Sequence, residues 1–448
     1  MKLTFVQPAI GHREGEGYIR SWQMEPLPIA TLAGLTPADV ELRFFDDRME
    51  SINFDEPTDA VVIPVETYTA MRAYQIASDY RKRNIPVVMG GFHPTLMPDE
   101  VSHHAEVVVT GEAEGIWTEV VDDLRHGTFK KRYHGEQGNL SAIRVDRSLF
   151  QGKRYLPIGL IETGRGCAFP CEFCAIQTFF ERSYRARPVD AVIEELKSLK
   201  KSKRLFFFVD DNFAGDIKTA KHLLPELAKL NIRWITQMSI NATHDEAFLK
   251  SLAHAGCKGV LIGFESLNEQ NLKRMKKSFN RMGGGYEVAL ANLRAHSIKV
   301  YGTFVFGYEH DTQHSFDEAV NFATDQGMYI AAFNHLTPFP GTPLYERLKQ
   351  ENRLRFDAWW LDPAYRYNEL PFSPKQLAPE EVTQGCVDAR RKFYKWPNIL
   401  KRSMDNRGDW FMFRNYFPIN AMHRNEISLR NGYPLGDERW VGQLLEAE

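Results

Sequence analysis

The chain has 448 residues, a length that suggests two or three domains rather than one core. Hydrophobic residues make up 43% and charged residues 25%, which excludes disordered and collagen-like chains. Lys and Arg (56) nearly balance Asp and Glu (58), so bulk charge does not favour nucleic acid or an anionic membrane. No run of eighteen apolar residues is present, and the N-terminus turns polar too early for a secretory signal, so we expect a cytoplasmic protein.

Residues 1–135 alternate β-rich runs with helical stretches, the pattern of a Rossmann-like parallel sheet. Ligands of such sheets bind beyond the carboxyl ends of the strands, so the segments after each strand are candidate ligand contacts. Gly90 and Gly91 allow close approach of a ligand or of another backbone, or they only make a tight turn. The predicted strands are 3–6, 40–45, 60–63, 85–89 and 107–109, and the predicted helices are 68–83 and 115–124.

A second alternating array, residues 157–345, follows a linker at 136–156. Six strand–helix repeats with right-handed crossovers predict a partial (β/α)6 TIM-like barrel, whose active site should lie at the carboxyl ends of the strands. Residues 346–448 turn helical and Trp-rich and are predicted to form a mainly helical C-terminal cap. The fold class is therefore α/β. The predicted barrel strands are 158–162, 205–210, 232–237, 259–264, 300–306 and 331–336.

Three of the five cysteines, Cys167, Cys171 and Cys174, lie within eight residues on a loop after the first barrel strand. Three thiols can hold a cubane iron–sulfur cluster and leave one iron open. A structural zinc site would need a fourth ligand, which this segment lacks. Cys257 and Cys386 are interpreted as buried small hydrophobic residues, and they are too few for a second cluster.

The segment from Arg165 to Cys174 resembles the radical S-adenosylmethionine (SAM) superfamily, whose signature is Cys-x3-Cys-x2-Cys with an aromatic residue, here Phe173, before the last cysteine. The resemblance implies a 4Fe-4S cluster whose open iron binds SAM. An electron from the cluster then cleaves SAM to a 5′-deoxyadenosyl radical. The protein would orient the cofactor and exclude water and oxygen.

Polar groups at the strand ends resemble SAM contacts of that superfamily. An acidic group after the second strand would accept from the SAM ammonium, and Glu265 would accept from the ribose hydroxyls. Taken alone, either acidic cluster could simply cap a helix. The SAM contacts implied are Phe173, Asp210, Asp211, Asn212, Gln237, Ser239, Glu265, Ser266, Phe304 and Pro338.

Residues 1–135 resemble the cobalamin-binding domain found upstream of many radical SAM barrels, through the segments around Gly90, Gly91 and His93 and around Gly111 and Glu112. These five residues are the implied cobalamin contacts. The Asp-x-His-x-x-Gly cobalt-ligating motif is absent, so His93 is interpreted as a loop residue rather than an axial ligand.

The resemblance favours a methyltransferase in which one SAM methylates cobalamin and a second supplies the radical that activates an unactivated carbon of a small-molecule substrate. Radical cyclisation, rearrangement or oxidation is the alternative. A non-enzymatic iron–sulfur or cobalamin carrier fits less well, because carriers ordinarily use four protein ligands. A reductant such as flavodoxin or ferredoxin is implied as a partner. No basic stripe indicates nucleic acid.

Overall fold

The computed structural model describes residues 1–18, 23–427, 429 and 431–446, which divide into two compact units. The first contains residues 1–156, 358–367 and 432–448, and the second contains 157–357 and 368–431. Residues 346–448, predicted as one C-terminal region, are therefore shared between the two units.

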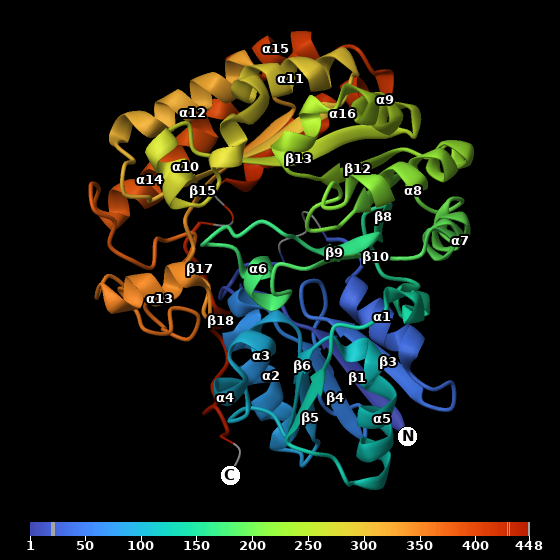
Figure 1. The fold of residues 1–448 in the computed structure, drawn as a ribbon. Coiled ribbons are helices and arrows are strands. Elements are labelled where there is room, and N and C mark those ends of the chain that lie inside the picture. Colours follow the sequence, from blue (N-terminus) through green and yellow to red (C-terminus); the bar gives the residue numbers. More distant parts are fainter. Residues whose placement is uncertain (19–22, 428, 430, 447–448) are drawn as a thin grey trace. The chain divides into compact units, whose positions relative to one another are not determined.

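The sheet of the first unit has six parallel strands in the order β3-β1-β4-β5-β6-β7 (Figure 1). The order reverses between β1 and β4, and such a reversal opens a crevice at the carboxyl ends of open α/β sheets. The central strands are buried along most of their length, as expected where helices cover both faces. The strands are β1 Lys2–Gln7, β3 Glu41–Asp46, β4 Ala60–Pro64, β5 Val87–Gly90, β6 Val107–Gly111 and β7 Arg132–Gly135.

Helices α1 (Leu27–Leu35), α2 (Ala70–Arg81), α3 (Phe92–Leu96), α4 (Pro98–Val101) and α5 (Trp117–His126) complete the Rossmann-like layers. The chain returns to this unit near its end. Strand β18 (Gly436–Asp437) pairs with β2 (Gly11–His12), and β17 (Tyr433–Pro434) pairs with β16 (Arg366–Tyr367).

The second unit contains six parallel strands in sequence order, with β8 and β15 at the two edges (Figure 1). Buried and half-buried residues alternate along them, as in a barrel wall. The sheet is open among the described strands, in agreement with the predicted partial (β/α)6 barrel. The strands are β8 Ile158–Ile161, β11 Leu205–Phe208, β12 Trp234–Gln237, β13 Cys257–Glu265, β14 Lys299–Phe306 and β15 Ile330–His335.

Helices pack against these strands through apolar stripes. In α8, Ala220, Leu223, Leu224 and Leu227 are buried at helical spacing, and the Asp216 side chain caps the helix by accepting from the Lys218 and Thr219 amides. The barrel helices are α7 Val189–Leu199, α8 Ile217–Leu230, α9 Glu246–His254, α10 Glu269–Arg274, α11 Gly285–Ala295 and α12 Gln313–Asp325.

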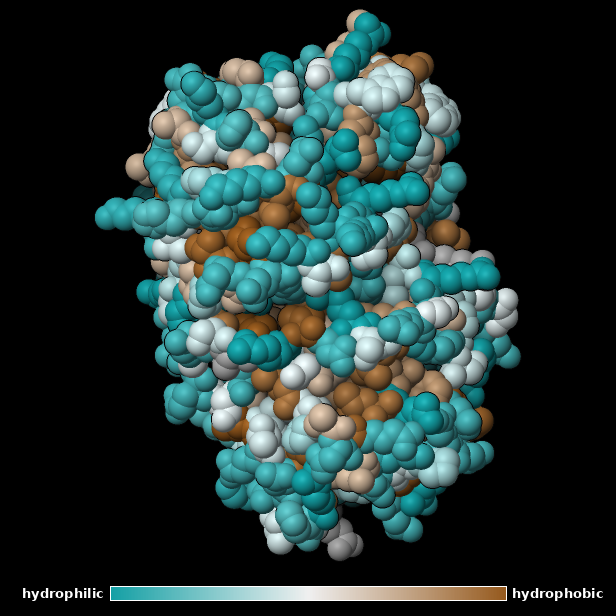
Figure 2. Space-filling view, turned by 90° about the vertical axis from the view of Figure 1, so that its right-hand side faces the viewer, coloured by the Kyte–Doolittle hydropathy of each residue, from teal (hydrophilic) through white to brown (hydrophobic). Residues whose placement is uncertain are grey.

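The remaining helices of this unit confirm a mainly helical C-terminal part: α13 Pro343–Gln350, α14 Pro379–Phe393, α15 Trp396–Ser403 and α16 Trp410–Glu426. In the described part of the chain, no helix is both long and apolar enough to span a bilayer. On the face in Figure 2, hydrophilic side chains predominate and several small hydrophobic patches lie between them.

Candidate active site

The cysteine loop begins beyond the carboxyl end of β8 and is closed at its base by two short antiparallel strands, β9 (Gly164–Gly166) and β10 (Tyr184–Ala186). Gly166 has a φ of +85°, and a Cβ there would lie 2.2 Å from the Ser183 carbonyl oxygen, so only glycine fits. Helix α6 (Ala175–Phe179) follows the last cysteine. The pairing of β9 with β10 was not predicted, and it holds the ends of the loop together.

The three thiols of the loop are buried or half-buried. Burial raises the pKa of Cys171 to about 12, while the charge of Lys277 lowers it. Among the described residues, no group of three His, Cys, Asp or Glu converges on a point where one metal ion could sit. Convergence is not needed for a cubane, because its cysteines bind different irons. A set of three thiols therefore fits a 4Fe-4S cluster with one open iron.

The other two cysteines do not complete such a site. Cys257 is the first residue of β13, and Cys386 lies in α14; both are buried, as predicted. Burial raises the pKa of each thiol to about 12. Neither belongs to the loop after β8.

Polar residues after β11 hold the cysteine loop at its start. Asp211 accepts a 2.7 Å hydrogen bond from the Gly166 amide, one residue before Cys167. Asp210 is 1% exposed, and its two oxygens accept from the amide (2.6 Å) and hydroxyl of Thr163. Burial raises the pKa of Asp210 to about 7 and that of Asp211 to about 6. These contacts hold Asp210 at the start of the cysteine loop, and its contact with SAM stays a prediction.

Asn212 joins the cysteine loop to the end of the neighbouring strand. Its amide nitrogen donates to the Cys167 sulfur at 3.8 Å, and its amide oxygen accepts from the Ser239 backbone N–H at 3.0 Å. Ser239 and Gln237 are half-buried at the carboxyl end of β12. The predicted residues after β11 and β12 are thus brought together at one edge of the sheet.

Glu265 ends β13 with a φ of +63°, an uncommon conformation for a residue with a side chain. Its carboxylate lies 2.7 Å from the Lys277 ammonium, which also donates to the Gly263 carbonyl oxygen at 3.3 Å. Burial acts to lower the pKa of Lys277, but the charges of Glu265 and Cys171 outweigh it, and the pKa is raised. Lys277 is therefore a fixed cation beside the thiols. A lone lysine after α10 gave no signal in the sequence.

Glu172, inside the cysteine loop, fastens that loop to α13. Its carboxylate accepts from the Arg347 guanidinium at 2.8 Å, and its carbonyl oxygen accepts from the Leu344 amide at 3.0 Å. Glu172 is 6% exposed, so this ion pair is largely removed from water. Sequence reasoning did not single out Glu172 or Arg347, because their contact spans 175 positions.

The four remaining residues predicted to contact SAM differ in their burial and in the groups that they touch. Phe304 is fully buried, with its ring stacked on Phe264 and Phe333 at centroid distances of 5.6 and 5.4 Å, so it belongs to the core and not to a ligand surface. The Ser266 hydroxyl accepts from the Asn268 amide at 3.1 Å, just before α10. Phe173 is partly buried against the core, and Pro338 is buried.

In the first unit, the predicted cobalamin contacts follow β5 and β6. Gly91 has a φ of +110°, and its Cβ position lies 3.1 Å from the Val65 carbonyl oxygen. Gly111 has a φ of +70°, and its Cβ position lies 2.2 Å from the Gly135 carbonyl oxygen. Both glycines therefore allow close approach of the chain's own backbone. Gly90 is half-buried, and a Cβ there would make ordinary contacts with Val109.

His93 lies in α3 rather than in a loop, which corrects that part of the prediction. Its side chain is fully buried, with Nε2 3.0 Å from Glu100 and the ring 5.6 Å from that of Trp360. The imidazole is therefore packed inside the first unit. Glu112 is also buried, and its carboxylate accepts from the Gly138 amide at 3.3 Å.

An open parallel barrel with a three-thiol loop at the carboxyl ends of its strands defines a class of SAM-cleaving iron–sulfur enzymes. The sequence model of the radical SAM superfamily matches residues 161–323. The chain is also 33% identical over 405 residues to bacteriochlorophyllide d C-12(1)-methyltransferase of Chlorobaculum tepidum, covering 87% of each chain. The protein therefore belongs to the radical SAM superfamily, and 4Fe-4S and SAM are its cofactors.

A second relative, bacteriochlorophyllide d C-8(2)-methyltransferase of Chlorobaculum tepidum, is 28% identical and covers 85% of this chain and 88% of the relative. Among solved structures, the radical SAM methyltransferase TsrM of Kitasatospora setae, with cobalamin and a 4Fe-4S cluster bound, matches with a TM-score of 0.66. That match has 18% identity and covers 95% of this chain and 99% of TsrM, so it supports the whole fold.

Proposed function

We propose that this radical SAM enzyme transfers a methyl group to a carbon atom of a small molecule, with cobalamin as the methyl carrier. The observation that carries the proposal is the loop of Cys167, Cys171 and Cys174 at the carboxyl ends of the barrel strands, with Lys277 beside it. The similarity of the whole chain to two methyltransferases of Chlorobaculum tepidum supports methyl transfer.

The three cysteines would bind the cluster as thiolates. When bound, the cluster supplies the electron that breaks a carbon–sulfur bond of SAM. Lys277 compensates the negative charge that the thiolates bring into a buried site, where an unpaired charge is costly. Asn212 donates toward the Cys167 sulfur, and hydrogen bonds to sulfur tune such clusters.

SAM would lie over the same strand ends. Of the residues predicted to contact it, Gln237 and Ser239 are half-buried there, and Asp211 keeps one oxygen not used by the Gly166 amide. Glu265 has a φ of +63°, and its carboxylate accepts from the Lys277 ammonium at 2.7 Å. We propose these four residues as the polar contacts of SAM.

Cobalamin would bind at the carboxyl edge of the parallel sheet in the first unit, beyond the ends of β5 and β6. The backbone around Gly90, Gly91 and Gly111 forms that edge, and Glu112 fixes the turn that follows. When bound, cobalamin supplies the methyl group. Because His93 is buried, we propose that cobalt is bound without a histidine from this segment.

The substrate we propose to test first is a cyclic tetrapyrrole, because the two relatives are named for bacteriochlorophyllide d. A protein reductant such as flavodoxin or ferredoxin would supply single electrons.

The test is anaerobic reconstitution with iron, sulfide and cobalamin, followed by incubation with SAM, a reductant and bacteriochlorophyllide d. Methyl transfer predicts about four irons and one cobalt per chain, 5′-deoxyadenosine, and a product that gains the methyl group of deuterium-labelled SAM. Production of 5′-deoxyadenosine with an altered but unmethylated substrate would favour cyclisation, rearrangement or oxidation. No 5′-deoxyadenosine from a fully loaded sample would favour a carrier.

A further inference from the structure

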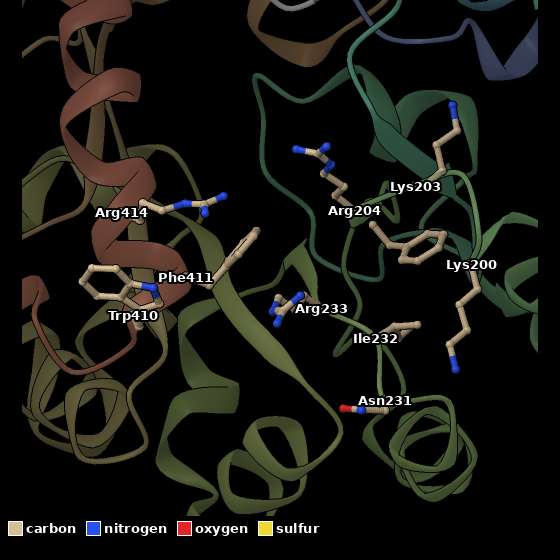
Figure 3. A pocket seen from close by; sticks show the side chains of 10 residues that line it. Lys200, Lys203, Arg204, Asn231, Ile232, Arg233, Trp410, Phe411 and Arg414 are labelled. Atoms are coloured by element: carbon tan, nitrogen blue, oxygen red, sulfur yellow. The ribbon is translucent and has the colours of Figure 1, made fainter.

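A cavity of about 430 Å³ lies at the opposite end of the barrel strands from the cysteine loop. Arg204 directly precedes β11, and Arg233 directly precedes β12, so both mark the amino ends of these strands. The other wall is the start of α16, with Trp410, Phe411 and Arg414 (Figure 3). The cavity belongs entirely to the second unit. It is therefore separate from the candidate active site.

The lining of this cavity is strongly basic. Five of its ten residues are Lys or Arg and none is acidic. In Figure 3 the guanidinium groups of Arg204, Arg233 and Arg414 turn toward the space between the strand ends and α16. Within the described part of the chain, none of these three arginines has a carboxylate within ion-pair distance. All three are exposed, and a bound anion would supply the counter-charge that they lack.

The acidic residue next to the cavity wall is already neutralised. Asp409 precedes Trp410, and its carboxylate pairs with the Lys258 ammonium at 2.8 Å and accepts from the Met412 amide at 3.0 Å. These contacts hold the pKa of Asp409 below its usual range, although burial acts to raise it. Asp409 thus leaves the cavity arginines without a counter-charge.

Aromatic rings lie among the cations. The Arg233 guanidinium is 4.7 Å from the centroid of the Phe411 ring, a cation–π contact that fixes the orientation of this arginine. Trp410 is 75% exposed, unusually high for so large an apolar side chain. Forked guanidinium groups match phosphate oxygens, and an exposed aromatic ring suits an apolar or ring-bearing part attached to that phosphate.

We propose that this cavity is a second binding site of the protein, specific for phosphate groups carried by a molecule that also has an apolar or aromatic part. An anionic lipid headgroup and a free phosphate compound such as a nucleotide share this chemistry. The site depends on neither the iron–sulfur cluster nor the proposed methyl transfer.

The test measures binding of two kinds of probe to the purified full chain. Adenosine triphosphate is titrated calorimetrically, and vesicles of phosphatidylcholine with or without phosphatidylglycerol are used for co-sedimentation. We expect saturable binding of at least one phosphate carrier, weaker at high salt. Binding of the nucleotide alone identifies a free phosphate compound, and binding of anionic vesicles alone identifies a lipid headgroup.

The variant Arg233→Gln/Arg414→Gln should weaken this binding at least about tenfold, because it removes two charge-assisted contacts. The matched control Lys218→Gln/Lys250→Gln removes the same charge from exposed positions on α8 and α9 and should bind normally. If the double variant misfolds, Arg414→Gln alone, exposed on α16, replaces it. No binding of either probe, or equal binding by the variant and the control, would overturn the proposal.

Discussion

Two buried aspartates follow parallel strands in the two units, and their surroundings are opposite. Asp47, after β3, accepts twice from the Arg72 guanidinium at 2.8 Å and lies 3.1 Å from His12. Burial acts to raise the pKa of Asp47, but Arg72 and His12 outweigh it and hold the pKa well below its usual range. Asp210, after β11, accepts from Thr163 instead, and burial raises its pKa to about 7.

The difference indicates what the polar groups at the carboxyl ends of the strands do in each unit. In the first unit the carboxylate at the strand end is neutralised by an arginine of α2, so this charge serves stability. In the second unit Asp210 and Asp211 bind backbone groups of the cysteine loop, and the nearby cation Lys277 is directed to Glu265 and the thiols. The polar groups at the strand ends of the second unit therefore hold the cysteine loop in place.

The largest effect is expected in the second unit from Cys171→Ala. Removing a residue that only hydrogen-bonds to a metal ligand lowers metal affinity or activity by roughly 10–100-fold. Loss of a cluster ligand itself should therefore reduce SAM cleavage by more than that. Iron content and 5′-deoxyadenosine are the measurements. Cys386→Ala, a buried thiol in α14, is the control and should keep both. Normal iron content with full activity in Cys171→Ala would contradict the cluster assignment.

In the first unit, Arg72→Ala should lower the free energy of unfolding by about 3–5 kcal/mol, because it takes the guanidinium partner from the buried Asp47 carboxylate and leaves it with the His12 ring and the Ala9 backbone N–H. Denaturant unfolding measures this loss. Arg83→Ala is the control: Arg83 pairs with Asp55 at the surface, so its removal should cost about 0–1 kcal/mol. Equal losses in the two variants would contradict a larger contribution to stability from the buried Arg72–Asp47 pair than from a surface ion pair.

Much of the fold could be predicted from the sequence, because each buried strand is a short apolar run between turn residues. The runs at 60–63 and 107–109 became β4 (Ala60–Pro64) and β6 (Val107–Gly111). Strand β7, with the sequence RYHG, was missed because it has no apolar run and gains its place only by pairing with β6.

The site was predictable where spacing along the chain carries the chemistry, as in the three cysteines. It was not predictable where distant segments meet, since Arg347 reaches Glu172 from 175 positions away. Phe304 was predicted to contact SAM because it lies on a barrel strand. Side chains alternate between the two faces of β14, and the Phe304 ring lies on the face that packs into the core.

The two aspartates should also respond oppositely to pH. The folded state raises the pKa of Asp210 from 3.8 to about 7, so it binds a proton that the unfolded chain releases between these values. Stability from Asp210 is therefore full below pH 3.8 and is lost as pH rises toward 7, by up to about 1.4 kcal/mol per pH unit. Urea unfolding of the metal-free protein across this range measures the slope.

Asp210→Asn, which mimics the protonated carboxyl, should reduce that slope, and the part that remains should come from groups such as Asp211, whose pKa burial raises to about 6. Asp47 has a lowered pKa, so its contribution is present above pH 3.8 and is lost as pH falls below it. Asp47→Asn should therefore flatten the acid side of the profile and leave the range from pH 4 to 7 unchanged. The same slope in wild type and Asp210→Asn would contradict the protonation of Asp210.

The smallest effect is expected from Gly111→Ala, which tests whether the glycine at the end of β6 is needed for backbone packing or for cobalamin binding. Gly111→Ala places a Cβ 2.2 Å from the Gly135 carbonyl oxygen at a φ of +70°, and we expect a loss of about 1–3 kcal/mol in unfolding free energy. Gly115→Ala, where nothing lies within 4 Å, is the matched control and should change stability by less than about 1 kcal/mol. If Gly111→Ala keeps its stability but loses cobalamin, this glycine serves the ligand. Loss of stability with cobalamin binding retained by the folded fraction would mean that the glycine serves the pairing of β6 with β7.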